Sequence, residues 1–440
     1  MSNFDLVLRL FLQLTVILLA CRIVGILGRY VGQTQVVSEM VTGVILGPSL
    51  LGSVFPSVQT WLFPAQLTVA VGGATAVIPH PSMSILYAFS QIGLVLYMFL
   101  IGLDFDAGLL RGRLRSAGTV SLAGIATPFA LGAAVAYWLL NESDFFSPGI
   151  IPWNAAMFMG ASMSITAFPM LARIIYENGI SGTSMGTMAL AAGSLDDVIA
   201  WCLLAVVLAV FNATPSTAVL AIGGGLLFGL GMVYLGRPAL RVLERWTDRD
   251  DGVTMTTLLT MLLVVMASAW FTDYIGVYAV FGAFIAGTVM PRGRFRADVR
   301  LRMEHLTTVL FLPLFFVYSG LNTRIGLVNT PWLWTLTVVI IALAVLGKGV
   351  ACTLAARLSG EPWREALAIG TLMNARGLME LIILNIGLQA GVIRPTLFTI
   401  MVLMAVVTTL MASPLFRFVY WGASEARQRP GSAGAMLATE

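Results

Sequence analysis

Apolar runs of about 20 residues recur along nearly the whole chain and are separated by short polar connections. A run of this length matches a helix that crosses the hydrocarbon core of a bilayer. The pattern predicts an all-α polytopic membrane protein with about 13 transmembrane helices. We place them near residues 6–27, 34–51, 84–103, 115–140, 153–176, 185–211, 215–236, 253–272, 275–291, 304–321, 331–356, 364–389 and 395–421. The Pro- and Gly-rich connection at 52–83 has room for a short re-entrant segment.

The composition agrees with a bilayer environment and excludes several other classes. Hydrophobic residues make up 58% of the 440 and charged residues only 10%, whereas about a quarter of a soluble protein is charged. Cys21, Cys202 and Cys352 all lie in apolar runs and form no CxxC pair, which argues against a disulfide scaffold or a zinc site. Arginines flank the apolar runs instead of forming one basic face, so we expect no nucleic-acid partner.

The distribution of arginine predicts the orientation in the membrane. With the N-terminus outside, 20 arginines lie on the inner side, and only Arg9, Arg324 and Arg394 lie outside. This asymmetry is typical of a cell (inner) membrane protein that follows the positive-inside rule. We therefore expect a multi-pass protein with a cytoplasmic C-terminus. We also expect a short polar cytoplasmic tail at 422–440, and no cleavable signal peptide, because the first run is long enough to span.

The order of the helices predicts an internal symmetry. A first repeat at about 6–211 would begin outside, and a second at about 253–421 would begin inside, with a linker helix at 215–236 between them. Two six-helix units of opposite orientation are typical of inverted-repeat transporters. This interpretation rests on topology, since the two halves show no convincing sequence identity. Residues 1–421 are expected to form a single transmembrane domain.

A few ionisable residues fall in the middle of predicted spans, where they are costly and mark functional sites. Asp196 and Asp197 are adjacent on one helix, and Lys348, the only lysine beside 24 arginines, lies on another. At 1.5 Å per residue, these side chains, Thr166 and Arg376 all lie about 14 to 18 Å from the inner ends of their helices. Polar groups of four helices thus meet at one depth, which predicts a transport site near the midplane.

The two aspartates are expected to have different partners. Neighbouring residues of a helix point about 100° apart, so one carboxylate pairs with Lys348 and the other faces a hydrated cavity. A purely structural ion pair between Asp196 and Lys348 is the alternative. That alternative leaves Asp197 unexplained, because an unpaired carboxylate at this depth is costly unless it binds something.

Two irregular stretches supply further candidate ligands. Pro169 removes a backbone donor, so freed carbonyls and the hydroxyls of Ser164 and Thr166 are expected to coordinate a small cation. The stretch Asn374–Gly377 is the matching irregularity in a later helix, and a plain kink is the alternative for both. Arg376 and Glu380, at i and i+4, are expected to form a structural or gating pair. His80 and His305 lie in or near predicted loops, where we expect solvated side chains.

Seven short stretches carry a resemblance to a known family. In chain order they are Leu46–Gly52 (LGPSLLG), Phe99–Asp104 (FLIGLD), Met163–Pro169 (MSITAFP), Ser194–Asp197 (SLDD), Leu314–Gly320 (LFFVYSG), Gly347-Lys348 and Asn374–Leu381 (NARGLMEL). In this order and at these helix positions, the chain resembles the second cation:proton antiporter family of the monovalent cation:proton antiporter superfamily. The stretches span nearly the whole chain.

The resemblance implies a fold and a mechanism. It implies 13 helices in two inverted repeats, a core domain of helices 4–6 and 11–13 in which helices 5 and 12 are broken and cross, and a homodimer. Asp197 matches the carboxylate that binds Na⁺ or K⁺ and protons in turn. Asp196 matches the neighbour that pairs with a lysine, here Lys348. Transport would follow an elevator form of alternating access, without a cofactor and without the nucleotide-binding gating module of the potassium-efflux members.

The expected function is therefore Na⁺/H⁺ or K⁺/H⁺ antiport, and two other functions stay open. A sodium-coupled symporter of a small organic anion can use a similar inverted-repeat fold, but usually lacks a mid-membrane lysine beside an aspartate pair. A membrane sensor would carry no flux. An enzyme is not expected, because the sequence shows no HExxH, Ser/Lys dyad or GxGD-type motif, and two aspartates on one helix do not face each other.

Overall fold

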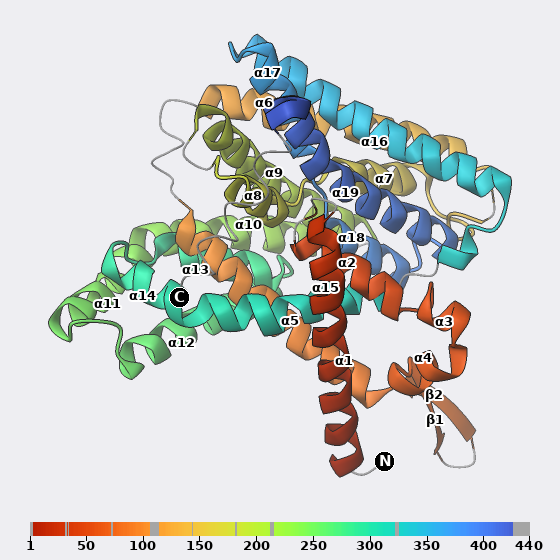
Figure 1. Ribbon diagram of the computed structural model, residues 1–440, viewed down its shortest axis with the longest axis horizontal. Coiled ribbons are helices and arrows are strands. Elements are labelled where there is room, and N and C mark those ends of the chain that lie inside the picture. The colour runs from red at the N-terminus through yellow and green to blue at the C-terminus, as the bar shows by residue number, and fades with distance from the viewer. Residues whose placement is uncertain are drawn as a thin grey trace. The chain divides into compact units, whose positions relative to one another are not determined.

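A computed structural model describes residues 3–30, 33, 35–71, 74–105, 114–142, 144–180, 183–211, 215–321 and 325–425. Most of the predicted tail at 422–440 lies outside these residues. The described chain is nearly all helical (Figure 1), as predicted. Nine of its helices are long and apolar enough to cross a membrane. The count of 13 and the division into inverted repeats stay predictions.

The chain divides into two compact units, each made of separate segments. Unit 1 comprises Met1–Leu27, Ser38–Phe105 and Val219–Arg324. It holds most of α1 (Asn3–Tyr30) and α2 (Gln35–Leu46), then α3 (Leu51–Val54), α4 (Pro56–Leu62), β1 (Gln66–Val71), β2 (Ala74–Pro79), α5 (Pro81–Asp104), most of α10 (Pro215–Gly231), a π-helical turn (Met232–Gly236), α11 (Arg237–Arg249), α12 (Met255–Tyr274), α13 (Ala279–Val289), α14 (Arg294–Leu306), a second π-helical turn (Thr307–Phe311) and α15 (Leu312–Leu321).

Unit 2 comprises Gly28–Val37, Asp106–Ala218 and Ile325–Glu440. It holds α6 (Leu114–Leu139), α7 (Pro152–Ser164), α8 (Phe168–Glu177), α9 (Ser184–Phe211), a 3-10 turn (Ile325–Leu327), α16 (Pro331–Leu358), α17 (Trp363–Met373), α18 (Leu378–Gln389) and α19 (Pro395–Glu425). These are the segments that the family resemblance assigns to the core. The predicted helices at 153–176 and 364–389 are each interrupted here, as α7–α8 and α17–α18.

Close backbone packing organises unit 1 around α5 and α13. A Cβ atom on Gly102 would lie 2.2 Å from the Phe284 carbonyl oxygen, and one on Gly287 would lie 2.3 Å from the Phe99 carbonyl oxygen. Neither position has room for a side chain. Small residues of this kind allow helices to approach closely where a lipid solvent supplies no hydrophobic driving force between them.

The connection between α2 and α5 contains structure that the sequence analysis did not predict. The short helices α3 and α4 are followed by an antiparallel hairpin, in which Gln66 of β1 lies opposite Pro79 of β2. The alternating segment QLTVAV, followed in the sequence by two glycines, is typical of a hairpin. The Pro and Gly content of the whole connection obscured that local signal.

His80 is buried, so the expectation of a solvated side chain is wrong at this position. Only 3% of the residue is exposed. Its Nδ1 accepts a hydrogen bond from the Ser82 backbone N–H at 3.2 Å, which caps the N-terminus of α5. The Ser82 hydroxyl lies 2.9 Å from the same nitrogen and 3.3 Å from Gln13 Nε2. Because a backbone N–H can only donate, this cap requires a neutral imidazole with an unprotonated Nδ1.

The His80 cap predicts a loss of stability in acid. Burial, followed by the positive charge of Arg9, lowers the pKa of His80 below its usual 6.5. A depressed folded-state pKa contributes stability above about pH 6.5, and this contribution is lost as the pH falls through the folded value. We expect His80→Asn, which keeps a capping oxygen at every pH, to reduce the acid loss, by about 1 kcal/mol for one cap. Thermal unfolding in detergent, followed from about pH 7.5 to about pH 5, measures the stability that each protein loses in acid.

The exposed His305 provides the control for this prediction. His305→Asn makes the same substitution at an exposed side chain, and its unfolding is compared with that of His80→Asn at each pH. If the wild type and His80→Asn lose the same stability between about pH 7.5 and about pH 5, the cap does not titrate in this pH range.

Candidate functional site

The site lies in unit 2, where the interruptions of two helices meet. α7 ends at Ser164 and α8 begins at Phe168, with an extended segment between them. Pro169 lies in the first turn of α8, where its missing N–H removes no helical hydrogen bond. The Ala167 N–H donates to the Ala375 carbonyl at 3.1 Å, so the backbone of the first interruption is bonded directly to that of the second.

The second interruption separates α17 from α18. Asn374 ends α17, and its Nδ2 donates to the Gly370 carbonyl at 3.1 Å. Thr409 of α19 holds the next turn of chain: its hydroxyl accepts from the Arg376 N–H at 3.2 Å and donates to the Arg376 carbonyl at 2.8 Å. A Cβ on Gly377 would lie 2.9 Å from Met170 Cγ and 3.3 Å from Ala167 Cβ, so a side chain there would have to displace Met170.

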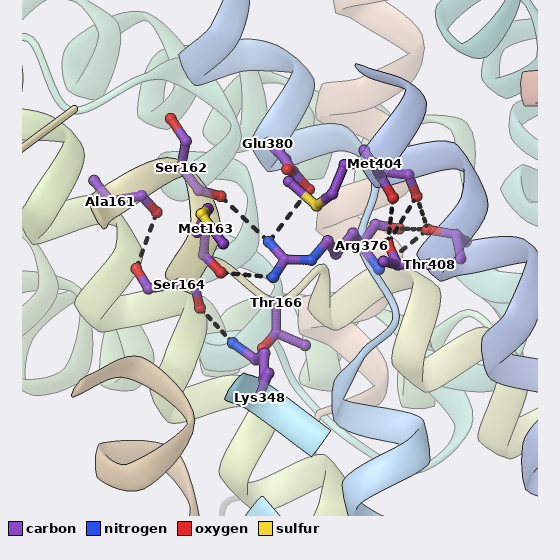
Figure 2. A network of polar contacts seen from close by, with 12 residues as sticks. Ala161, Ser162, Met163, Ser164, Thr166, Lys348, Arg376, Glu380, Met404 and Thr408 are labelled. Atoms are coloured by element: carbon purple, nitrogen blue, oxygen red, sulfur yellow. Dashed lines mark hydrogen bonds and ion pairs between the residues drawn. The ribbon is translucent and has the colours of Figure 1, made fainter. Parts of the chain in front are cut away.

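The interruption leaves the last four carbonyls of α7 without helical partners, and four side-chain hydrogen bonds replace them (Figure 2). Ser164 Oγ donates to the Ala161 carbonyl at 2.9 Å. The Arg376 guanidinium donates to the Ser162 and Met163 carbonyls at 3.3 and 2.6 Å. Lys348 Nζ donates to the Ser164 carbonyl. Two cationic side chains therefore lie at the negative end of the α7 dipole.

These contacts change what the predicted ligands do in the structure. Ser164 and Thr166 were expected to offer hydroxyls to a cation, together with freed carbonyls. Here the Ser164 hydroxyl bonds Ala161, and the Thr166 hydroxyl donates to Asp196 Oδ2 at 2.6 Å. Both hydroxyls act as donors in these bonds, which leaves their oxygen lone pairs for a cation. A cation that used the freed carbonyls would have to displace Arg376 or Lys348 as their donors. Their assignment as cation ligands stays a prediction.

Asp196 pairs with Lys348, as the sequence analysis proposed for one of the two aspartates. Lys348 Nζ lies 3.2 Å from Asp196 Oδ2, and neither side chain is exposed. Oδ2 also accepts from Thr166, whereas Oδ1 accepts from the Ser121 hydroxyl of α6. Sequence reasoning missed Ser121, because a serine in an apolar helix carries no charge or motif that distinguishes it.

Asp197 has a different environment from its neighbour. The residue is 5% exposed, and its Oδ1 is buried without a hydrogen-bond partner among the described residues. The backbone N–H of Phe168, the first residue of α8, hydrogen-bonds the same carboxylate. The positive end of a helix thus faces this acidic group. Asp197 is an anionic acceptor with one open oxygen.

Arg376 and Glu380 form the predicted pair. Arg376 lies 3.6 Å from Glu380 Oε2, and both side chains are completely buried. Arg376 therefore contacts an acidic group and the end of α7 at once, whereas Asn374 caps α17. A Cβ on Gly349 would lie 2.6 Å from Asn374 Nδ2, so α16 passes close to this cap. The role of Arg376 and Glu380 as a structural or gating pair stays a prediction.

The buried charges of the site do not cancel. Lys348 and Arg376 provide two positive charges, and Asp196, Asp197 and Glu380 three negative ones when all are ionised. One negative charge remains, and a single monovalent cation or proton would neutralise it. Within the described residues, no group of three or more His, Cys, Asp or Glu is arranged to hold a metal ion. One unit of positive charge is therefore enough to balance these ionised side chains.

Nearly the whole chain is similar to known proteins. The family described as "Sodium/hydrogen exchanger, transmembrane" matches residues 15–421. The Na⁺/H⁺ antiporter NhaS4 of Synechocystis is 37% identical over 93% of this chain and 96% of its own length. The K⁺/H⁺ antiporter 1 of Saccharomyces cerevisiae is 34% identical over 95% of this chain, which spans about half (47%) of that protein. The solved sodium proton antiporter MjNhaP1 of Methanocaldococcus jannaschii shares the fold, with a TM-score of 0.63 at 13% identity over 97% of this chain and 100% of its own.

Proposed function

The chain belongs to the sodium/hydrogen exchanger family of membrane transporters, and we propose that it exchanges Na⁺ or K⁺ for protons by competition at Asp197. It is a multi-pass membrane transporter and not an enzyme. The observation that carries the proposal is the open Oδ1 of Asp197, a buried carboxylate oxygen to which none of the described residues donates a hydrogen bond. Such an oxygen needs a positive partner, and a proton or a monovalent cation supplies one.

Competition for one carboxylate is sufficient for obligatory exchange. A bound cation requires an ionised Asp197, and a bound proton removes the charge that holds the cation. Because only one positive charge is needed for neutrality, the two ligands exclude each other. Either occupied site is nearly neutral, whereas the empty site keeps a buried charge that opposes movement through the bilayer. Alternating access then couples the two fluxes.

Lys348 decides whether exchange moves net charge. Its ammonium bridges Asp196 and the Ser164 carbonyl, so loss of its proton would break both contacts. Two protons per cation would cross if Lys348 releases and regains a proton in each cycle. We expect Lys348→Gln to lose the response of exchange to membrane voltage, measured in proteoliposomes with a valinomycin-set potassium potential. Voltage-sensitive exchange in Lys348→Gln would contradict this role.

The arginine asymmetry and the family resemblance support the arrangement in the membrane. We propose a homodimer in the cell (inner) membrane, with the N-terminus outside and the C-terminus in the cytoplasm. Unit 2 would be the part that moves in an elevator form of alternating access, because it contains the complete site. Accessibility labelling of single cysteines on intact cells tests the orientation.

Proton flux in proteoliposomes tests the proposed function. An inside-acid pH gradient is set, and NaCl, KCl or choline chloride is then added outside. Antiport predicts that Na⁺ or K⁺, but not choline, dissipates the gradient, and the active salt identifies the ion. Cation uptake that requires an organic anion would instead indicate the symporter. A folded, inserted protein without cation-dependent flux would overturn the proposal.

A further inference from the structure

We propose that Ser121 of α6 is a positioning residue of the cation site, which holds Asp196 turned toward Lys348 so that, of the two adjacent aspartates, only Asp197 offers an open carboxylate oxygen. The inference rests on the function proposed above. Neither the sequence motifs nor the charge pattern marked this residue.

Both oxygens of Asp196 are held by hydrogen bonds from different parts of unit 2. Oδ2 accepts from Thr166 at 2.6 Å and lies 3.2 Å from Lys348 Nζ. Oδ1 accepts from Ser121, which lies 75 positions earlier in the chain. With donors on both oxygens, the carboxylate cannot rotate without breaking a buried hydrogen bond. Ser121 provides the only bond to Oδ1 within the part of the chain that the structure describes.

The packing of α6 explains how so short a side chain reaches Asp196. Gly124 follows Ser121 by three residues, on the same face of α6. A Cβ there would lie 2.6 Å from Cys352 Sγ, 3.8 Å from Lys348 Cε and 3.9 Å from Asp196 Oδ2. The absent side chain leaves room for the lysine and lets α6 approach α16 and α9 closely. The Ser121 hydroxyl is then within reach of Asp196.

The two aspartates differ in how many of their oxygens are hydrogen-bonded, and Ser121 maintains this difference. Both oxygens of Asp196 accept hydrogen bonds, whereas Asp197 Oδ1 accepts none from the residues that the structure describes. Without Ser121, Asp196 Oδ1 becomes a second open carboxylate oxygen on the neighbouring residue. A cation bound at Asp197 is then attracted more strongly by the neighbouring Asp196 charge, which Ser121 no longer partly neutralises, so that its binding is stronger and its release slower. Transport requires binding that is weak enough to reverse.

The prediction is therefore a specific change of kinetics in Ser121→Ala. We expect KM for the transported cation to fall by about three- to tenfold and Vmax to fall by a similar factor, because tighter binding of the ground state does not speed the cycle. Ser121→Thr, which keeps a hydroxyl donor, should behave like the wild type. A merely structural role would lower Vmax and leave KM unchanged or raised.

The experiment uses the full chain in proteoliposomes and measures initial rates of cation-dependent proton flux against NaCl and KCl concentration. Thr119→Ala is the matched control, because the exposed Thr119 lies on the same helix and donates to the Arg115 carbonyl of its own helix at 2.8 Å. As a readout independent of flux, cation-dependent thermal stabilisation in detergent should begin at lower cation concentration in Ser121→Ala.

The outcomes separate this inference from the proposed function. No cation-dependent flux in the wild type defeats the proposed function. If the wild type is active and Ser121→Ala has an unchanged KM, the proposed role of Ser121 is wrong, whether or not Vmax falls. The proposed function is not affected by that result. If Ser121→Ala does not fold, Ser121→Cys, with a similar volume and a weaker donor, is judged by the same criteria.

Discussion

Asp197→Asn is expected to abolish cation-dependent proton flux, down to the rate of protein-free liposomes. The amide keeps the size of the side chain but cannot ionise, so it neither attracts a cation nor carries a proton across the membrane. Fold stability should not decrease, since the variant removes a buried negative charge whose Oδ1 has no hydrogen-bond partner in the described structure. Flux after addition of NaCl or KCl to acid-loaded proteoliposomes measures the effect.

Two variants make this result specific to the position. Asp251→Asn removes a carboxylate whose side chain is 90% exposed, in the connection between α11 and α12, and should transport like the wild type. Asp196→Asn removes the partner of Lys348, and any residual cation-dependent flux in it would still require Asp197. Exchange that persists in a folded Asp197→Asn would place the competition of cation and proton elsewhere.

Arg376→Ala is expected to destabilise the protein by about 3–5 kcal/mol, the usual effect of removing one partner of a buried ion pair. The substitution leaves the Ser162 and Met163 carbonyls without their donors and Glu380 without its counter-charge. Both consequences leave buried polar groups without partners, which is costly. Thermal unfolding in detergent, followed by tryptophan fluorescence, measures the loss.

Matched variants separate the two contributions of Arg376. Arg376→Lys keeps the charge, but a single ammonium does not reproduce the fork that reaches two carbonyls, so we expect intermediate stability. Adding Glu380→Gln to Arg376→Ala removes the uncompensated carboxylate and should recover part of the loss. An Arg376→Ala variant as stable as the wild type would show that the end of α7 does not depend on these contacts.

The fold class could be predicted from the sequence because the signal is local. A run of about 20 apolar residues must be a helix in a bilayer, since no other single-segment structure satisfies its backbone there. The same locality explains why the ionisable residues in mid-span, such as Asp197 and Lys348, were found as candidates. Each stands out against the apolar residues of its own helix, and no knowledge of its partner is needed.

Two weaker local signals in the sequence, one for a hairpin and one for a helix cap, were missed or misinterpreted. The hairpin of β1 and β2 has a short alternating pattern, which the surrounding Pro and Gly residues obscured. His80 was interpreted as solvated from its position near a predicted loop, whereas it is buried as the cap of α5. Burial at a helix end depends on what other segments cover it, and the sequence around one histidine does not carry that information.

By itself, then, the sequence determined that the chain is helical, lies in a membrane and carries a few charges within its apolar segments, because hydrophobic length and charge are properties of each segment. Only the tertiary structure decided which groups meet. Ser121 bonds Asp196 across 75 positions, and Arg376 bonds the Met163 carbonyl across 213. These pairings give Asp196 a full set of donors and leave Asp197 with an open oxygen, although the two residues are chemically identical neighbours. Helix packing, which brings distant segments together, is the physical reason for that difference.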